Sequence, residues 1–156
     1  MKLARVGVMA AAVLAVATLA FAQAKPDFSG TWTAVPAADA PAGGGGGRGM
    51  MGPFTVTQKA DTLTVERTFG DNKITTVYKL DGTEAVNKMM GRGGNEVEVK
   101  SIAKWDGSKL VITESRPGQD GAVMETTQTW SLGADGMLTI DRTGGRGPST
   151  TKYKKG

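Results

Sequence analysis

The sequence predicts an all-β protein, an antiparallel up-and-down β-barrel of about ten strands. From Phe28 onward the chain consists of short segments rich in Thr, Val and Ile in which apolar and polar residues alternate, as they do in half-buried strands. Clusters of Gly and Asp separate these segments, and no window shows a sustained helical period. Consecutive strands joined by brief turns usually pair, and closing the resulting meander into a barrel removes its exposed edges.

Each expected strand is an alternating segment with turn residues at its ends. In chain order the segments are 28–35, 54–59, 62–69, 73–80, 83–89, 96–105, 109–115, 122–132, 137–142 and 149–155. The links after the second, fourth, sixth and eighth segments read AD, DG, DG and GADG. In such links Gly or Asp supplies the backbone angles of a tight hairpin turn.

The remaining links are rich in glycine, and three of them contain Gly-Arg-Gly, as in GGGGGRGMMG (43–52). Alternate links of an up-and-down meander lie at the same end. The tight turns should therefore form a closed end, and the glycine-rich links should form a mouth. The residues expected at the rim of the mouth are Arg48, Arg92, Arg116, Arg146, Met50, Met51, Met89 and Met90. The alternative is that these links are ordinary surface loops.

Alternation also brings charged side chains inside the barrel. Arg67, Glu114 and Arg142 each share a face with apolar residues of their own strand, and they fall near the mouth. Tyr78 and Gln128 belong to two further inward-facing sets. Buried charges must be paired or solvated, so this cluster needs water, an anionic ligand or both. The alternative is that the charged groups extend to solvent or pair with one another.

Large apolar side chains gather toward the opposite end. Trp32, Trp105 and Trp130 each fall close to the tight turns. We therefore expect an apolar plug at the closed end, with room above it for the apolar tail of a ligand in the bottom half of the barrel.

The first 24 residues have the three-part pattern of a secretory signal peptide. Residues 1–6 carry two positive charges, residues 7–21 are apolar, and Ala22–Ala24 (AQA) offers small residues to signal peptidase. We predict cleavage after Ala24 and a periplasmic or secreted chain without stable membrane insertion. An uncleaved membrane anchor is the alternative. Residues 25–156 should form one monomeric barrel domain in which 36–53 is a flexible glycine-rich loop.

Composition excludes several classes of function. Without His or Cys the chain has no Ser-His-Asp or Cys-His machinery and no thiolate zinc site. Paired acid–base catalysis needs two inward carboxylates, and the sequence offers only Glu114, so we expect neither enzyme activity nor a cofactor. Of 19 basic residues, Lys2 and Arg5 lie in the signal segment, which leaves 17 against 15 acidic ones. This near-neutral balance does not favour nucleic-acid binding.

Methionine is the one soft metal ligand that the chain offers. Thioethers suit Cu(I), but methionine pairs more often supply adaptable apolar contact, and we expect no metal.

The segment FSGTW (28–32) resembles the Gly-x-Trp opening of the calycin superfamily, which comprises the lipocalins and the fatty-acid-binding proteins. Gly30 and Trp32 match the motif, and Phe28 is the preceding aromatic residue. YKLDGTEAVN and AKWDGSKLVITES are similar to segments of small exported bacterial proteins called lipocalin-like, a resemblance that covers most of residues 25–156. The resemblance implies an up-and-down barrel that holds a small hydrophobic ligand.

Two features depart from the fatty-acid-binding proteins. Those proteins have a helical lid between the first two strands, where this chain has the glycine-rich segment 36–53. They also hold a carboxylate with an Arg-x-Tyr pair in the last strand, where this chain has Thr151 and Tyr153. The sequence therefore does not predict fatty-acid binding of that kind.

These observations lead to an exported binding protein for a small amphipathic or anionic ligand. The expected ligand-binding residues are Arg67, Tyr78, Arg92, Glu114, Gln128 and Arg142. The alternative is a non-enzymatic structural or interaction module of the cell envelope with a filled barrel. An open interior between the tryptophans and the mouth distinguishes the first from the second.

Overall fold

The computed structural model describes residues 24–36, 52–91, 94–118, 120–145 and 147–156, and every regular element in these ranges is a β-strand. The predicted all-β fold is confirmed, and the ten observed strands lie within two residues of the predicted bounds. They are β1 (Gly30–Ala34), β2 (Phe54–Gln58), β3 (Thr62–Phe69), β4 (Asn72–Lys79), β5 (Glu84–Met90), β6 (Glu96–Asp106), β7 (Lys109–Pro117), β8 (Val123–Leu132), β9 (Leu138–Gly144) and β10 (Ser149–Lys155).

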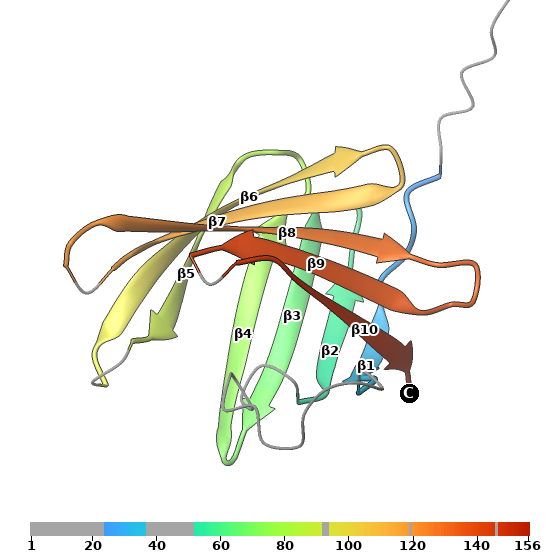
Figure 1. Cartoon of the computed structure of the whole chain (residues 1–156), viewed down its shortest axis with the longest axis horizontal. Coiled ribbons are helices and arrows are strands. Elements are labelled where there is room, and N and C mark those ends of the chain that lie inside the picture. The colour runs from blue at the N-terminus through green and yellow to red at the C-terminus, as the bar shows by residue number, and fades with distance from the viewer. Residues whose placement is uncertain (1–23, 37–51, 92–93, 119, 146) are drawn as a thin grey trace, which may run out of the picture.

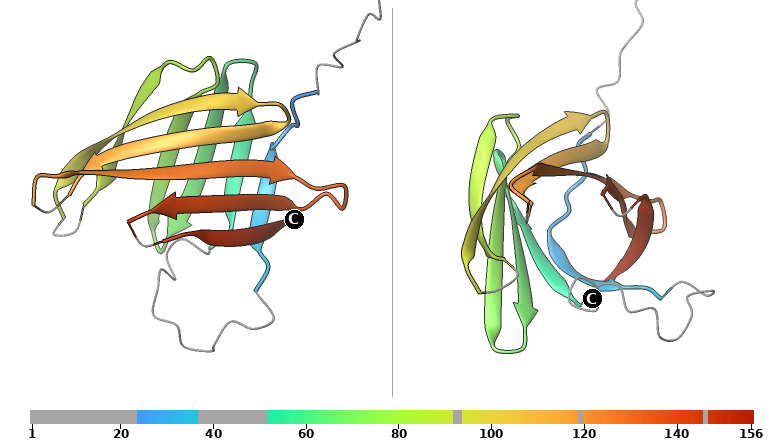
Figure 2. Two further views of the ribbon diagram at one scale, coloured as in Figure 1. Left: turned by 45° about the horizontal axis from the view of Figure 1, so that its top comes forward. Right: turned by 60° about the vertical axis from the view of Figure 1, so that its left-hand side comes forward.

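The strands form one antiparallel sheet that curls into a nearly closed barrel. Their order is β4-β3-β2-β1-β10-β9-β8-β7-β6-β5, so the first and last strands of the chain pair in the middle of the sheet, with Trp32 opposite Lys155 and Ala34 opposite Tyr153. β6 to β9 cross over β2 to β4 (Figure 1), and the view along the barrel shows the strands encircling its interior (Figure 2). Among the described residues, no helix is long and apolar enough to cross a bilayer.

The tight turns are built as their residues suggest. Gly82 and Gly107 have φ angles of 82° and 60°, a region that glycine enters without the steric penalty of a side chain. With ten antiparallel strands, the links after β2, β4, β6 and β8 share the closed end, and the other five share the mouth. Of the expected rim residues, Arg48, Met50, Met51, Arg92 and Arg146 lie outside the described residues.

An aromatic cluster fills the closed end. The ring of Phe28 stacks on Trp105 with centroids 6.0 Å apart, and it meets Trp130 edge-on at 5.7 Å. The Phe28 carbonyl accepts a 2.8 Å hydrogen bond from Nε1 of Trp32. Phe28 therefore joins all three tryptophans, as expected for residues at one end of the barrel.

One pairing expected from the meander is absent, because β4 and β5 follow one another in the chain but share no ladder. We call the gap between β4 and β5 the seam. There a side chain forms the hydrogen bonds that a strand backbone would form in a ladder. The Val77 N–H donates to Oδ1 of Asn87 at 2.8 Å, and Asn87 Nδ2 donates to the Val77 carbonyl at 2.9 Å. Asn87 is buried, and its amide imitates one backbone pair of a ladder.

The hydrogen bonds of Asn87 at the seam should contribute to the stability of the fold. Replacing Asn87 by Ala removes both hydrogen bonds and leaves the N–H and carbonyl of Val77 without their partner. We expect the free energy of unfolding in urea to fall by about 1–3 kcal/mol. Asn72→Ala, at the exposed start of β4, is the matched control and should change it little. Equal unfolding midpoints for the two variants would contradict this assignment.

Candidate functional site

The inward-facing side chains change in character along the barrel. Toward the closed end they are fully packed: Leu63, Leu110, Ile112 and Leu138 have no accessible surface at all. No water-sized void can therefore touch them, and the expectation that the bottom half of the barrel accepts a ligand tail is wrong. Toward the mouth the inward-facing residues are half-buried, which shows that solvent reaches them. They are Arg67, Phe69, Ile74, Thr76, Met89, Val97, Glu114, Thr126 and Arg142.

Glu114 of β7 lies at the centre of a polar network between these two zones. The Tyr78 hydroxyl donates to Oε1 of Glu114 at 2.7 Å, and Nε2 of Gln128 donates to Oε2 at 2.9 Å. Tyr78 and Gln128 are both buried and come from β4 and β8. Each carboxylate oxygen thus accepts a hydrogen bond from a neutral donor, which offsets its partial removal from water.

Gln128 connects this network to the aromatic plug. Its Oε1 accepts hydrogen bonds from Nη2 of Arg142 and from Nε1 of Trp130, both at 3.3 Å. Because the amide oxygen faces only donors and the amide nitrogen faces a carboxylate, the orientation of this amide is fixed by its partners. Arg142 is in turn positioned by a residue directly opposite it in the β8–β9 ladder.

Arg67 of β3 approaches the same network from the other side. Its guanidinium lies over the ring of Phe54, 4.5 Å from the centroid, and Phe54 is its partner in the β2–β3 ladder. Burial lowers the pKa of Arg67, and the nearby Arg142 lowers it further, whereas Tyr153, Tyr78 and Glu114 raise it. An arginine remains charged at any physiological pH, so the site holds two guanidinium groups.

Tyr78 supplies a neutral hydroxyl. Burial raises its pKa well above the ordinary value of 10, and the charge and hydrogen bond of Glu114 raise it further. The phenol therefore stays protonated and acts as a donor. Among the described residues, the cluster thus combines two guanidinium groups with one carboxylate in a partly desolvated place.

The structure brings together five of the six residues that the sequence singles out, namely Arg67, Tyr78, Glu114, Gln128 and Arg142. The sixth, Arg92, lies outside the described residues.

The sequence did not lead us to expect that the Phe54 ring lies against the Arg67 guanidinium, and we assigned no function to Tyr153. Tyr153 is buried beside Phe54, with ring centroids 5.0 Å apart. The available signal was the spacing of Phe54 and Val56, because alternate residues of one strand share a face, here the inward one. Of the rim residues that are described, Met89 is half-buried, whereas Met90 and Arg116 are exposed. The two adjacent methionines thus lie on opposite faces of the sheet.

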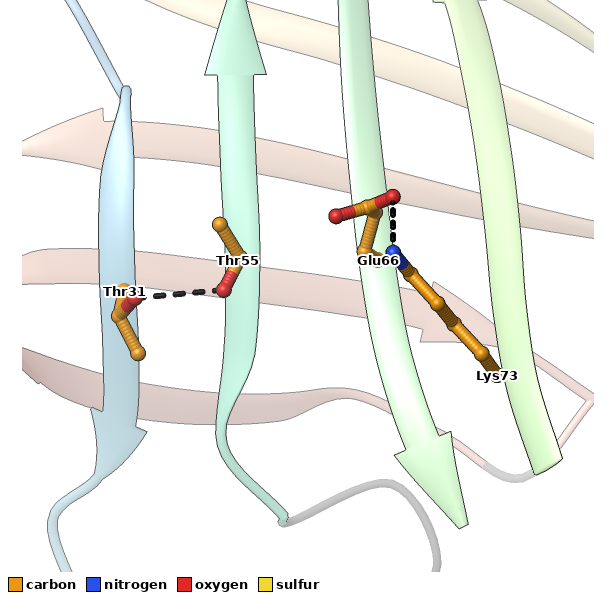
Figure 3. Close-up of polar contacts among 4 residues, drawn as sticks. All are labelled: Thr31, Thr55, Glu66 and Lys73. Atoms are coloured by element: carbon orange, nitrogen blue, oxygen red, sulfur yellow. Dashed lines mark hydrogen bonds and ion pairs between the residues drawn. The ribbon is translucent and has the colours of Figure 1, made fainter. Parts of the chain in front are cut away.

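Two hollows are lined by described residues outside this cluster. One, of about 390 Å³, lies on the outer face of β1 to β4 and includes Thr31, Thr55, Glu66 and Lys73. There the two threonine hydroxyls are 3.2 Å apart, and Lys73 Nζ lies 2.7 Å from Oε1 of Glu66 (Figure 3). These polar groups of the hollow are therefore already paired with one another. The other, of about 180 Å³, lies at the seam. In the described part of the chain, no three acidic residues are grouped to hold a metal ion.

Comparison with known proteins supports the fold rather than a specific activity. No family model matches the chain, and no curated protein matches it in sequence. Among solved structures, it is similar to the wild-type fluorescent protein UnaG, with a TM-score of 0.56 and 25% identity over 83% of this chain and 97% of that one. The barrel is therefore of the calycin type, like those of lipocalins and fatty-acid-binding proteins.

The raised pKa of Tyr78 predicts how the protein responds to alkali. The folded protein keeps a proton that the unfolded chain releases above about pH 10, so the stabilisation is fully present below pH 10 and is lost as the pH rises further. In Tyr153→Phe, which leaves Tyr78 as the one tyrosine, tyrosinate absorbance at alkaline pH should show a midpoint well above 10. Unfolding the same variant in urea should return the midpoint to about 10.

The same titration tests the cause of the shift. Adding Glu114→Gln removes the negative charge beside the phenol and should lower the folded midpoint. Identical midpoints in the folded and the unfolded protein would contradict the burial of this hydroxyl.

Proposed function

We propose that the protein is an exported, non-enzymatic binding protein for a small amphipathic anion, whose head group enters the mouth and is held by Arg67 and Arg142. The observation that carries this proposal is the meeting of two guanidinium groups and one carboxylate in a partly buried cluster that solvent reaches. The similarity to a calycin-type barrel supports a general binding function.

The residues of the cluster have different roles in this proposal. A guanidinium grips a carboxylate, sulfate or phosphate through two charge-assisted hydrogen bonds, so Arg67 and Arg142 contact the head group. Gln128 positions Arg142, and Glu114 offsets part of the positive charge. A neutral head group could not form charge-assisted hydrogen bonds of this kind with the guanidinium groups, which selects against it.

The filled closed half of the barrel favours a second function, a structural or interaction module of the cell envelope. That function would use the mouth only as a surface. It does not require three ionisable residues from three strands to keep solvent contact inside the barrel, whereas the binding function does. We therefore prefer the binding function.

The charge of the cluster can be removed with little change in volume. The variant Arg67→Met/Arg142→Met should bind dodecanoate more weakly by on the order of 10- to 100-fold, because it loses two charged contacts. Binding of the uncharged analogue dodecanol should change much less. Titration calorimetry measures both.

Arg116→Met is the matched control, because Arg116 is exposed on β7 near the same mouth. It should leave both affinities nearly unchanged. If neither compound binds the wild-type protein, or if the double variant binds dodecanoate as tightly as wild type, the binding function fails and the interaction module replaces it.

Export forms part of the proposal and rests on the sequence of residues 1–24, of which 1–23 lie outside the described residues. Expression of the full chain with export should yield a mature protein that begins at Lys25, as intact-mass measurement will show. A chain that retains the apolar segment would contradict the localisation.

A further inference from the structure

The seam is the one place in the described barrel where two neighbouring strands lack a ladder, and it opens toward the mouth. Near the closed end the strands are held by Asn87 and Val77. Beyond this contact β4 and β5 diverge (Figure 1). The hollow of about 180 Å³ lies there, between Ile74 and Thr75 of β4 and Met89 and Met90 of β5.

The inner wall of this hollow is apolar. Ile74 and Met89 occupy inward-facing positions of their strands and are half-buried, whereas their neighbours Thr75 and Met90 are exposed. A polar outer lip is formed by Lys73, paired with Glu66, and by Lys88, paired with Glu96. An apolar chain in the hollow would thus contact Ile74 and Met89 on its inner side.

The hollow adjoins the charged cluster. Ile74 is directly opposite Arg67 in the β3–β4 ladder, and side chains at such positions lie about 4.5–5.5 Å apart at Cβ. A molecule whose head group is held by Arg67 can therefore reach the seam without crossing another strand. It cannot extend toward the closed end, because Leu63 and Ile112 leave no free volume there.

The width of the seam selects what can enter. At Asn87 a single side chain bridges the two backbones through direct hydrogen bonds, which leaves no room for an inserted strand, since that needs two strand spacings of about 4.8 Å. A peptide strand would have to break the Asn87–Val77 hydrogen bonds. A single hydrocarbon chain would not.

We propose that the seam is a lateral subsite for the apolar part of the ligand. An anionic amphiphile would place its head group at Arg67 and Arg142 and its hydrocarbon chain between Ile74 and Met89. This inference rests on the proposed binding function and adds the location and chemistry of the second half of the site.

Two pairs of substitutions test the inference on opposite faces of the same strands. Ile74→Thr/Met89→Gln makes the inner wall polar without adding charge. Val77→Thr/Val86→Gln makes matching changes on the outer face of the same strands, where both residues are exposed and neither lines the hollow. For wild type, calorimetry with carboxylates from octanoate to dodecanoate should show about a fourfold gain in affinity for each added methylene.

The inward variant should reduce this gain to about twofold or less per methylene, because the chain then meets polar groups. The outward variant should keep the wild-type gain. Equal affinity gains per methylene in the two variants, together with weak binding by Arg67→Met/Arg142→Met, would contradict the seam as a subsite. The proposed function would then still stand. If dodecanoate does not bind wild type at all, the proposed function fails, and the seam with it.

A measurement on the wild-type protein avoids any effect of substitution on folding. Dodecanoate with a nitroxide at its chain terminus broadens nearby nuclear resonances in protein labelled with ¹³C at the methionine methyl groups. The signal of Met89 should broaden most. Preferential broadening of Met137, which lies in the turn between β8 and β9 at the closed end, would overturn the inference.

Discussion

Two consecutive residues of β4 hold the barrel together across its unpaired seam. Val77 uses its backbone, which bonds to the side chain of Asn87 on β5. Tyr78 uses its side chain, which crosses the interior to Glu114 on β7. Because β4 and β5 are the two ends of the sheet, both contacts substitute for the ladder that would otherwise complete the ring. The position of the charged cluster follows from this closure, since Glu114 is fixed by a residue on the far side of the seam.

This arrangement separates residues that maintain the fold from residues available for binding. Glu114 accepts hydrogen bonds from two buried donors, Tyr78 and Gln128, and removing it would leave both without their acceptor. A loss of binding on changing Glu114 would therefore confound stability with recognition. Arg67 and Arg142 are half-buried at the mouth, so they report on recognition more directly.

The sequence predicts the strands and the charged cluster because both depend on local rules. Period-two alternation places Arg67, Glu114 and Arg142 inside, and the parity of tight and glycine-rich links places them at one end. The seam could not be predicted, because nothing local in EAVNKMM shows that the Asn87 amide would replace a backbone pair. The tail site was misplaced for a related reason: alternation tells which face a leucine occupies but not whether its neighbours fill the space beside it. Arg92 lies outside the described residues.

The positive charge of the site comes from strands other than the one that the fatty-acid-binding proteins use. Thr151 stands where their last strand has arginine, and it pairs with Ile140 of β9, while the guanidinium groups come from β3 and β9. Arg67 therefore lies next to β4, at the edge of the sheet, and next to the hollow at the seam. A head group held there would have its apolar part directed sideways between two strands, because the packed core blocks the barrel axis. The adjacent methionines fit this geometry, because Met89 is half-buried and would contact the proposed chain, whereas Met90 is exposed.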